Sequence, residues 1–238
     1  MARPRPELLR SADLHAALAF VADMAAAIGD ADGFARCGLE RLPTLAASEL
    51  TTLSVCDLCG GRRHVTGMPA GAIGAAEREA FDQHFRQHPL VRYHAVEGGT
   101  HTHRISDSMP FERFRDSALY ADYYHRVGID HAVALPIHVG DGWLVSFVLN
   151  RRGRDFSDRE LALLDCVRLP LSRLFGHTRT LERARHAWRH ASDDPPELPA
   201  TLPLTVRERQ TLRWVAAGKT DRDIAAILAI SPRTVHKH

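Results

Sequence analysis

The chain has 238 residues, 45% of them hydrophobic, which is enough for a substantial buried core and for two domains. The formal net charge of only +2 excludes a uniformly basic protein. No apolar run reaches the length of a transmembrane helix, and four cysteines without a secretory signal predict a cytoplasmic protein with no disulfides and no membrane partner.

The N-terminal segment is expected to form a helix rather than a signal peptide. Asp13, His15 and Asp23 interrupt its apolar residues, which follow helical spacing, so an amphipathic helix over 12–28 is the better interpretation. The sequence then predicts, in order, a helix over 33–47, strands over 50–58 and 62–66 around a Gly60-Gly61 turn, a helix over 75–86, and loops with helices over 88–127.

The clearest β signal is a hairpin. Two apolar runs, 132–139 and 143–149, flank the glycine-containing turn 140–142. A final long helix begins at Ser157, where Glu160 completes a capping box. Helices that flank a largely antiparallel sheet predict an α+β fold for this part of the chain.

The last predicted sensory helix carries an apolar row with a seven-residue repeat, formed by Val167, Leu174, Leu181 and Trp188, and Pro170 is expected to kink it. This row either pairs two subunits into a homodimer or packs on its own sheet. Residues 193–203 follow with four prolines and no periodicity, which predicts a stiff linker. The expected division is a sensory domain over 1–176, a signalling helix and linker over 177–203, and a small all-α domain over 204–238.

The C-terminal 35 residues predict two capped helices and the start of a third. Thr205 and Glu208 form a capping box, Thr220 caps the second helix, and Ser231 caps the third, with Pro232 at its first position. The packing faces are expected at Val206, Leu212, Val215 and Ala216 of the first helix, at Ile224, Ala225, Ile227 and Leu228 of the second, and at Val235 of the third.

These residues resemble the LuxR-type (GerE-like) helix-turn-helix of bacterial transcription regulators. The match runs through Leu204-Thr205-x-Arg207-Glu208, Ala217-Gly218-Lys219-Thr220, Ile224-Ala225-x-x-Leu228 and Ser231-x-x-Thr234-Val235-x-x-His238. Residues 204–238 carry seven Lys or Arg against three Asp or Glu, a local charge of +4 suited to phosphates, whereas a helical hairpin that only completes a core would not need it. The resemblance implies double-stranded DNA as partner, and the expected contacts are Arg233, Thr234, His236 and Lys237, with Lys219 and Arg222 as weaker phosphate contacts.

Two features depart from the family. His236 stands where the family commonly has Lys or Arg, which predicts weaker binding as pH rises. The family's recognition helix also continues about two turns past the last residue here. The sequence is therefore expected to be a C-terminally truncated protein or a fragment that binds DNA poorly.

The preceding region is similar to GAF-type sensory domains. The resemblance rests on His88-Pro89-Leu90-Val91, Ile105-Ser106-Asp107, Gly128-Ile129, Asn150-Arg151, Asp155 to Glu160, and Leu163-Leu164. It implies a cavity for an unidentified small molecule between sheet and helices. Acyl-homoserine-lactone receptors share this layout, but their pocket is expected to offer an Asp-Pro step and a nearby Trp. His88 precedes Pro89 here, and no Trp comes before Trp143, so that ligand is not expected.

Other chemistry has little support. Cys56 and Cys59 have the spacing of half a zinc site or of a redox pair, but core and strand-end cysteines are the favoured interpretation. The fifteen histidines include His84/His88, His186/His190 and His101/His103, without a recognisable ligand array. Tyr120, Tyr123, Tyr124 and Trp143 either line a pocket or belong to the core.

No catalytic motif is found, so no enzyme activity, metal or cofactor is predicted. The sequence therefore predicts a LuxR-type DNA-binding regulator, homodimeric, whose GAF-like domain senses a signal. The alternative is a stand-alone ligand-binding or redox-sensing protein that has lost DNA binding.

Overall fold

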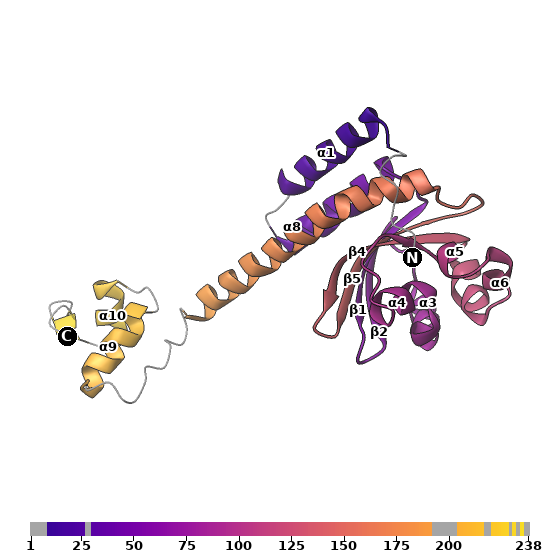
Figure 1. Ribbon diagram of the computed structural model, residues 1–238. Helices are drawn as coiled ribbons and strands as arrows, with labels where there is room; N and C mark the ends of the chain where they lie inside the picture. Colours follow the sequence, from indigo (N-terminus) through magenta and orange to yellow (C-terminus); the bar gives the residue numbers. More distant parts are fainter. Residues whose placement is uncertain are drawn as a thin grey trace. The chain divides into compact units, whose positions relative to one another are not determined.

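The computed structural model describes residues 9–26, 30–191, 204–216, 220–228, 230–231 and 234–235, without the side chains of 181–191 and 216. The chain divides into two compact units, Met1–Thr178 and Arg179–His238 (Figure 1). None of the described helices combines the length and apolar character needed to cross a membrane.

The first unit is built around one five-stranded antiparallel sheet with strand order β2-β1-β5-β4-β3. The strands are β1 (Leu50–Asp57), β2 (Arg62–Met68), β3 (His103–Arg104), β4 (His131–Gly140) and β5 (Trp143–Arg151). The helices are α1 (Ser11–Ala26), α2 (Ala31–Arg41), α3 (Ala75–Gln83), α4 (Pro89–Ala95), α5 (Ile105–Ser108), α6 (Phe111–Arg115), α7 (His125–Val127) and α8 (Asp158–Ala191), with 3₁₀ turns at Leu42–Thr44 (η2) and Phe85–Gln87 (η3) and a π-helical turn at Tyr120–Tyr124 (η4). The part of α8 that follows Thr178 belongs to the second unit.

Alternation along the strands gives the sheet two different faces. One face packs under α1, α2 and α8, and the other under α3, α4 and η4 (Figure 1). The first face is apolar, because β4 and β5 place Val133, Leu135, Val145, Phe147 and Leu149 in one core. Gly38 of α2 lies so close to the Phe147 ring that a Cβ there would meet it at 2.3 Å, so α2 packs tightly on this face.

Helix α8 begins as the sequence predicts. The Ser157 backbone N–H donates to Glu160 Oε2 at 2.7 Å, and the Glu160 N–H donates to Ser157 Oγ at 3.3 Å. The α8 assignment continues through Pro170. Val167 is buried and Leu174 packs on the same core, so this part of the seven-residue row packs on its own sheet, while the side chains of Leu181 and Trp188 lie outside the described residues.

The α+β prediction is confirmed, with small differences in length. The second predicted helix ends earlier than expected, at Arg41, because Pro43 lies in the 3₁₀ turn that follows. The predicted hairpin is present, and a register shift between Pro136 and His138 leaves Ile137 as an extra residue in β4. The predicted linker over 193–203 lies outside the described residues.

The second unit contains α9 (Val206–Ala216) and α10 (Asp221–Leu228). The three predicted caps are present: the Glu208 N–H donates to Thr205 Oγ1, the Asp223 N–H to Thr220 Oγ1, and the Thr234 N–H to Ser231 Oγ, at 3.1 to 3.3 Å. Buried Ile224, Ala225 and Val235 form its small core, with Trp214, Leu228 and Ile230 packed against it.

The expected packing face of the first of these helices was wrong. Val206 is 74% exposed, and Leu212 and Val215 are also exposed, whereas Thr211 is buried and Trp214 packs against the small core. Trp214 presents more apolar area to α10 than a valine does, so the helix turns that side inward. Ile227 of α10 is likewise 45% exposed, while its neighbours Ile224 and Ala225 are buried.

Candidate ligand cavity and DNA-binding segment

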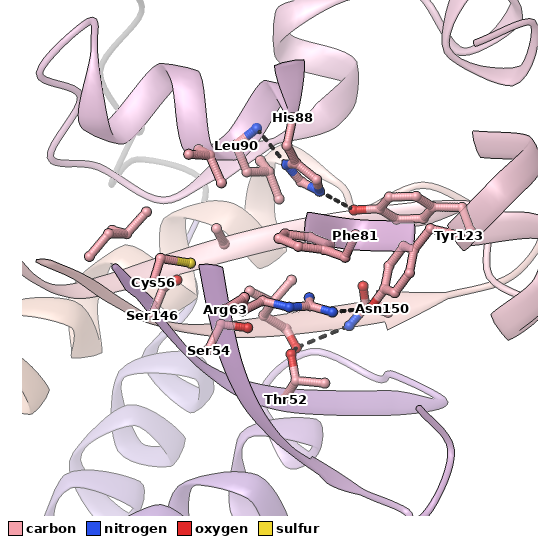
Figure 2. A pocket seen from close by; sticks show the side chains of 15 residues that line it. Thr52, Ser54, Cys56, Arg63, Phe81, His88, Leu90, Tyr123, Ser146 and Asn150 are labelled. Carbon is pink, nitrogen blue, oxygen red and sulfur yellow. Dashed lines mark hydrogen bonds between the residues drawn. The ribbon is translucent and has the colours of Figure 1, made fainter. Parts of the chain in front are cut away.

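A cavity lies on the second face of the sheet, beneath α3, α4 and η4 (Figure 2). Its empty volume is about 420 Å³ when the part that opens to solvent is included. The lining residues are Thr52, Ser54, Cys56, Arg63, Phe81, His88, Leu90, Val91, Tyr123, Tyr124, Ala134, Leu144, Ser146, Val148 and Asn150.

Arg63 is the only charged side chain among these lining residues apart from the ionisable His88. It faces Cys56 across the β1–β2 pair and is only 9% exposed. Its guanidinium carbon lies 3.5 Å from the centre of the Phe81 ring, and its Nη2 donates to the Tyr123 hydroxyl at 2.9 Å (Figure 2). The Nε atom of Arg63 is buried and has no hydrogen-bond partner.

His88 is held as a neutral side chain at the N-terminus of α4. Its Nδ1 accepts a hydrogen bond from the Leu90 backbone N–H at 3.2 Å, so the ring proton lies on Nε2, which donates to the Tyr124 hydroxyl at 2.8 Å. Burial, with a further contribution from the Arg63 charge, lowers the pKa of His88 to about 3. The Tyr124 hydroxyl accepts from His88 and can still donate its own hydrogen into the cavity.

The floor of the cavity combines polar side chains with the apolar Ala134, Leu144 and Val148. Thr52 and Ser54 of β1 and Ser146 and Asn150 of β5 alternate with the apolar residues of the opposite face. Asn150 is engaged, because its Nδ2 donates to the Leu50 carbonyl at 3.0 Å and to the Val148 carbonyl at 3.2 Å. In contrast, the Ser54 hydroxyl is buried without a partner.

The electrostatic balance of the cavity is positive. Burial raises the pKa of the Cys56 thiol to about 12, and burial raises the pKa of Tyr124 well above its ordinary value, so both side chains are neutral. No Asp or Glu is among the lining residues. The Asp82 carboxylate accepts a hydrogen bond from the Arg63 backbone N–H at 3.0 Å and not from its guanidinium. The lining therefore combines one buried cation with neutral groups.

The structure separates the aromatic residues that the sequence grouped together. Tyr123 and Tyr124 line the cavity. In contrast, the Tyr120 hydroxyl donates a hydrogen bond to the Asp130 carboxylate, and Trp143 is exposed at the start of β5. Sequence reasoning missed Arg63 and Ser54. Strict alternation from Cys56 along β1 would have placed Ser54 on the same face, but no local pattern marks Arg63 as buried.

Among the described side chains, the histidine and cysteine pairs do not meet as ligands, and the side chains of His186 and His190 lie outside the described residues. His84 pairs with Asp122, His101 pairs with Asp165, and His103 stacks on the Tyr93 ring at 3.5 Å. Cys56 is buried and Cys59 is exposed in the turn after β1. Within the described part of the chain, no group of three or more His, Cys, Asp or Glu side chains could hold a metal ion.

Two of the six expected DNA contacts fall on described residues. Arg222 is exposed in the first turn of α10, and Thr234 is half-buried with its hydroxyl 2.7 Å from that of Ser231 in the third cap. Arg233, His236, Lys237 and Lys219 lie outside the described residues. The second unit thus presents a capped helix pair and the start of a third helix held by Val235.

Comparison with known families and sequences identifies the C-terminal segment. Residues 202–238 match the family described as bacterial regulatory proteins, luxR family. The chain is 27% identical to the HTH-type quorum sensing-dependent transcriptional regulator RpaR of Rhodopseudomonas palustris, over 89% of this chain and 88% of that protein. It is also 51% identical over 37 residues, 16% of each chain, to the transcriptional activator protein AnoR of Acinetobacter nosocomialis.

Solved structures share the fold of the first unit. The VqsR LBD domain from Pseudomonas aeruginosa aligns with a TM-score of 0.55 and 14% identity, over 71% of this chain and 99% of that one. CepR2 from Burkholderia cenocepacia, an N-acylhomoserine lactone dependent LuxR family transcription factor, aligns with a TM-score of 0.50 and 12% identity, over 73% and 99%. At these identities the likeness establishes the fold.

Proposed function

We propose that this protein is a LuxR-type transcriptional regulator and that a small molecule bound in the cavity controls how the C-terminal segment binds double-stranded DNA. The observation that supports the ligand is the cavity itself, which is closed on one side by the sheet and contains buried polar atoms without partners. Buried polar atoms are normally satisfied, so their presence in a cavity favours a ligand as the missing partner. The role we propose is regulatory and not enzymatic, in the cytoplasm where DNA is available.

The DNA contacts remain those that the sequence predicts. We propose that Arg233, Thr234, His236 and Lys237 approach the duplex from the third helix, and that Lys219 and Arg222 contact phosphates. The exposure of Arg222 supports this role, because a phosphate contact needs a cation that reaches solvent. Such contacts release counterions, so DNA affinity should fall steeply with salt.

A homodimer is part of the proposal. Regulators of this kind read two half-sites about 34 Å apart, and two copies of a short recognition helix are needed for that spacing. Leu14 and Leu18 are exposed one turn apart on α1, 47% and 68%, which supports an apolar contact between subunits. Sedimentation of wild type and Leu18→Asp tests this: the wild type should sediment as a dimer and the variant as a monomer.

The central test measures DNA affinity against salt, with a duplex that the protein selects from a random library. Arg222→Ala should reduce the slope of log affinity against log salt by about 0.9, the amount expected for one phosphate contact. Arg113→Ala is the matched control, because Arg113 is an exposed arginine of α6 in the first unit. A slope unchanged by Arg222→Ala but reduced by Arg113→Ala would contradict the proposed interface.

A further inference from the structure

The most unusual feature of the cavity is a buried cation without a buried anion. None of the ion pairs in the described part of the chain involves Arg63, although its side chain is nine-tenths buried. A buried charge is costly unless it is paired and hydrogen-bonded. Two contacts compensate part of this cost: the Phe81 ring stacks on the guanidinium, and the Tyr123 hydroxyl accepts a hydrogen bond from it. They leave its Nε without an acceptor.

A second unpartnered atom lies beside it. Ser54 and Arg63 are diagonal neighbours on the same face, because Cys56 faces Arg63 and Ser54 is the next residue of β1 on that side. The Ser54 hydroxyl is buried, 3% exposed for the residue, and lacks a hydrogen-bond partner. Two donors and one positive charge therefore face the same part of the cavity (Figure 2).

The other groups of the cavity narrow the chemistry of the ligand. His88 is neutral, and both of its ring nitrogens are engaged, so it cannot accept an amide N–H as a carboxylate would. The walls over the sheet are apolar, formed by Phe81, Leu90 and Val91, and Leu144 adds an apolar side chain from β5 itself. A single guanidinium matches one negative charge, and a planar carboxylate accepts from its fork with good geometry. A dianionic phosphate would leave a second charge against apolar walls.

We propose that the ligand is a small organic carboxylate, whose oxygens accept hydrogen bonds from the Arg63 guanidinium and the Ser54 hydroxyl while an apolar body packs against Phe81, Leu90 and Leu144. This inference rests on the proposed function, since it names the class of molecule for the same cavity. Tyr124 contributes a neutral donor held in place by His88. Arg63 is thus a specificity-determining residue that selects a charged head group.

The test compares charged and neutral probes of the same shape on the full chain. Sodium octanoate and sodium phenylacetate are titrated calorimetrically beside octanamide and phenylacetamide. N-octanoyl-homoserine lactone is compared with its ring-opened acid, which differs from it by the carboxylate that hydrolysis exposes. The carboxylates should bind about 10- to 100-fold more tightly than their neutral partners, as expected for charge-assisted hydrogen bonds.

Variants locate this preference. Arg63→Gln should abolish the difference between carboxylate and amide, Arg63→Lys should keep the preference with about tenfold weaker binding, and Arg62→Gln should change nothing, because Arg62 is the exposed neighbour on β2. Ser54→Ala should weaken carboxylate binding several-fold, about the value of one hydrogen bond, and serves if Arg63→Gln does not fold.

The outcomes separate this inference from the proposed function. Equal binding of amides and carboxylates, a preference for the lactone, or no binding of any carboxylate would overturn the carboxylate assignment. Carboxylates that bind through Arg63 without any change in DNA affinity would support the assignment and contradict the proposed control of DNA binding. If only the neutral probes bind, and their binding alters DNA affinity, then the proposed control of DNA binding is supported and the carboxylate assignment is contradicted.

Discussion

Two buried arginines lie on opposite faces of the same sheet, and their surroundings differ. Arg151 of β5 belongs to the face under α8 and donates two hydrogen bonds to Glu160, at 2.8 and 3.0 Å. Arg63 of β2 belongs to the cavity face and has no carboxylate partner. Both guanidinium groups stack on an aromatic ring, Phe156 and Phe81 respectively. The comparison shows that the arginine on one face is paired with a carboxylate, and that the cavity face keeps buried polar atoms without hydrogen-bond partners.

The largest expected effect tests the apolar character of the first face. Phe147→Ala removes a side chain that is completely buried and packed against Phe34 and Gly38. The free energy of unfolding should fall by about 3–5 kcal/mol, measured by urea denaturation. Val148→Ala is the neighbouring control on the cavity face, where side chains pack less completely, and it should cost about 1 kcal/mol. Comparable losses would mean that the two faces contribute equally to stability.

The same substitution at the two arginines sharpens the comparison directly. Arg151→Met leaves the largely buried Glu160 carboxylate without its arginine partner, so it should lower the free energy of unfolding by about 3 kcal/mol. Arg63→Met should change it by less than about 1 kcal/mol, because the lost hydrogen bond to Tyr123 is offset by removal of an uncompensated charge. Urea denaturation of both variants in the absence of ligand gives the two values. A larger loss at Arg63 would assign that residue a mainly structural role.

A pH titration tests the paired arginine in another way. Burial alone would raise the pKa of Glu160, but hydrogen bonds from Arg151 and Ser157 lower it to about 2. A carboxylate whose folded pKa lies below its unfolded value of about 4.5 stabilises the fold above pH 4.5, and this contribution is lost as pH falls toward 2. The loss should be on the order of 1–2 kcal/mol after allowance for partial exposure. Glu160→Gln should be less stable than wild type at pH 7 and should lack this part of the decline, as thermal melts between pH 2 and 7 would show.

The two arginines also show how far sequence patterns reach. The cap at Ser157 and Glu160 and the hairpin beside it were predictable, because each depends on residues within a few positions of one another. The Arg151–Glu160 pair is similarly local, because the two residues are nine positions apart and Glu160 belongs to that cap.

Arg63 could not be recognised in this way. It sits in a polar, charged edge strand, and its partner Tyr123 comes sixty positions later from a π-helical turn. The predicted packing face of α9 was wrong for a related reason. Whether Val206 or Trp214 is packed inward depends on contacts with α10, which the periodicity of α9 alone does not contain.

The smallest expected effect has the opposite sign to the others. Ser54→Ala removes a buried hydroxyl that has no hydrogen-bond partner, so the ligand-free protein should become more stable by about 0.5–1 kcal/mol. Ser117→Ala is the matched control, because its hydroxyl donates to the Phe114 carbonyl at 2.6 Å and accepts from the Tyr120 N–H at 3.2 Å, and it should lose about 1 kcal/mol. Urea denaturation of the two variants measures both changes. If Ser54→Ala loses as much as Ser117→Ala, then the Ser54 hydroxyl is already satisfied without a ligand, and the cavity face is as complete as the face opposite.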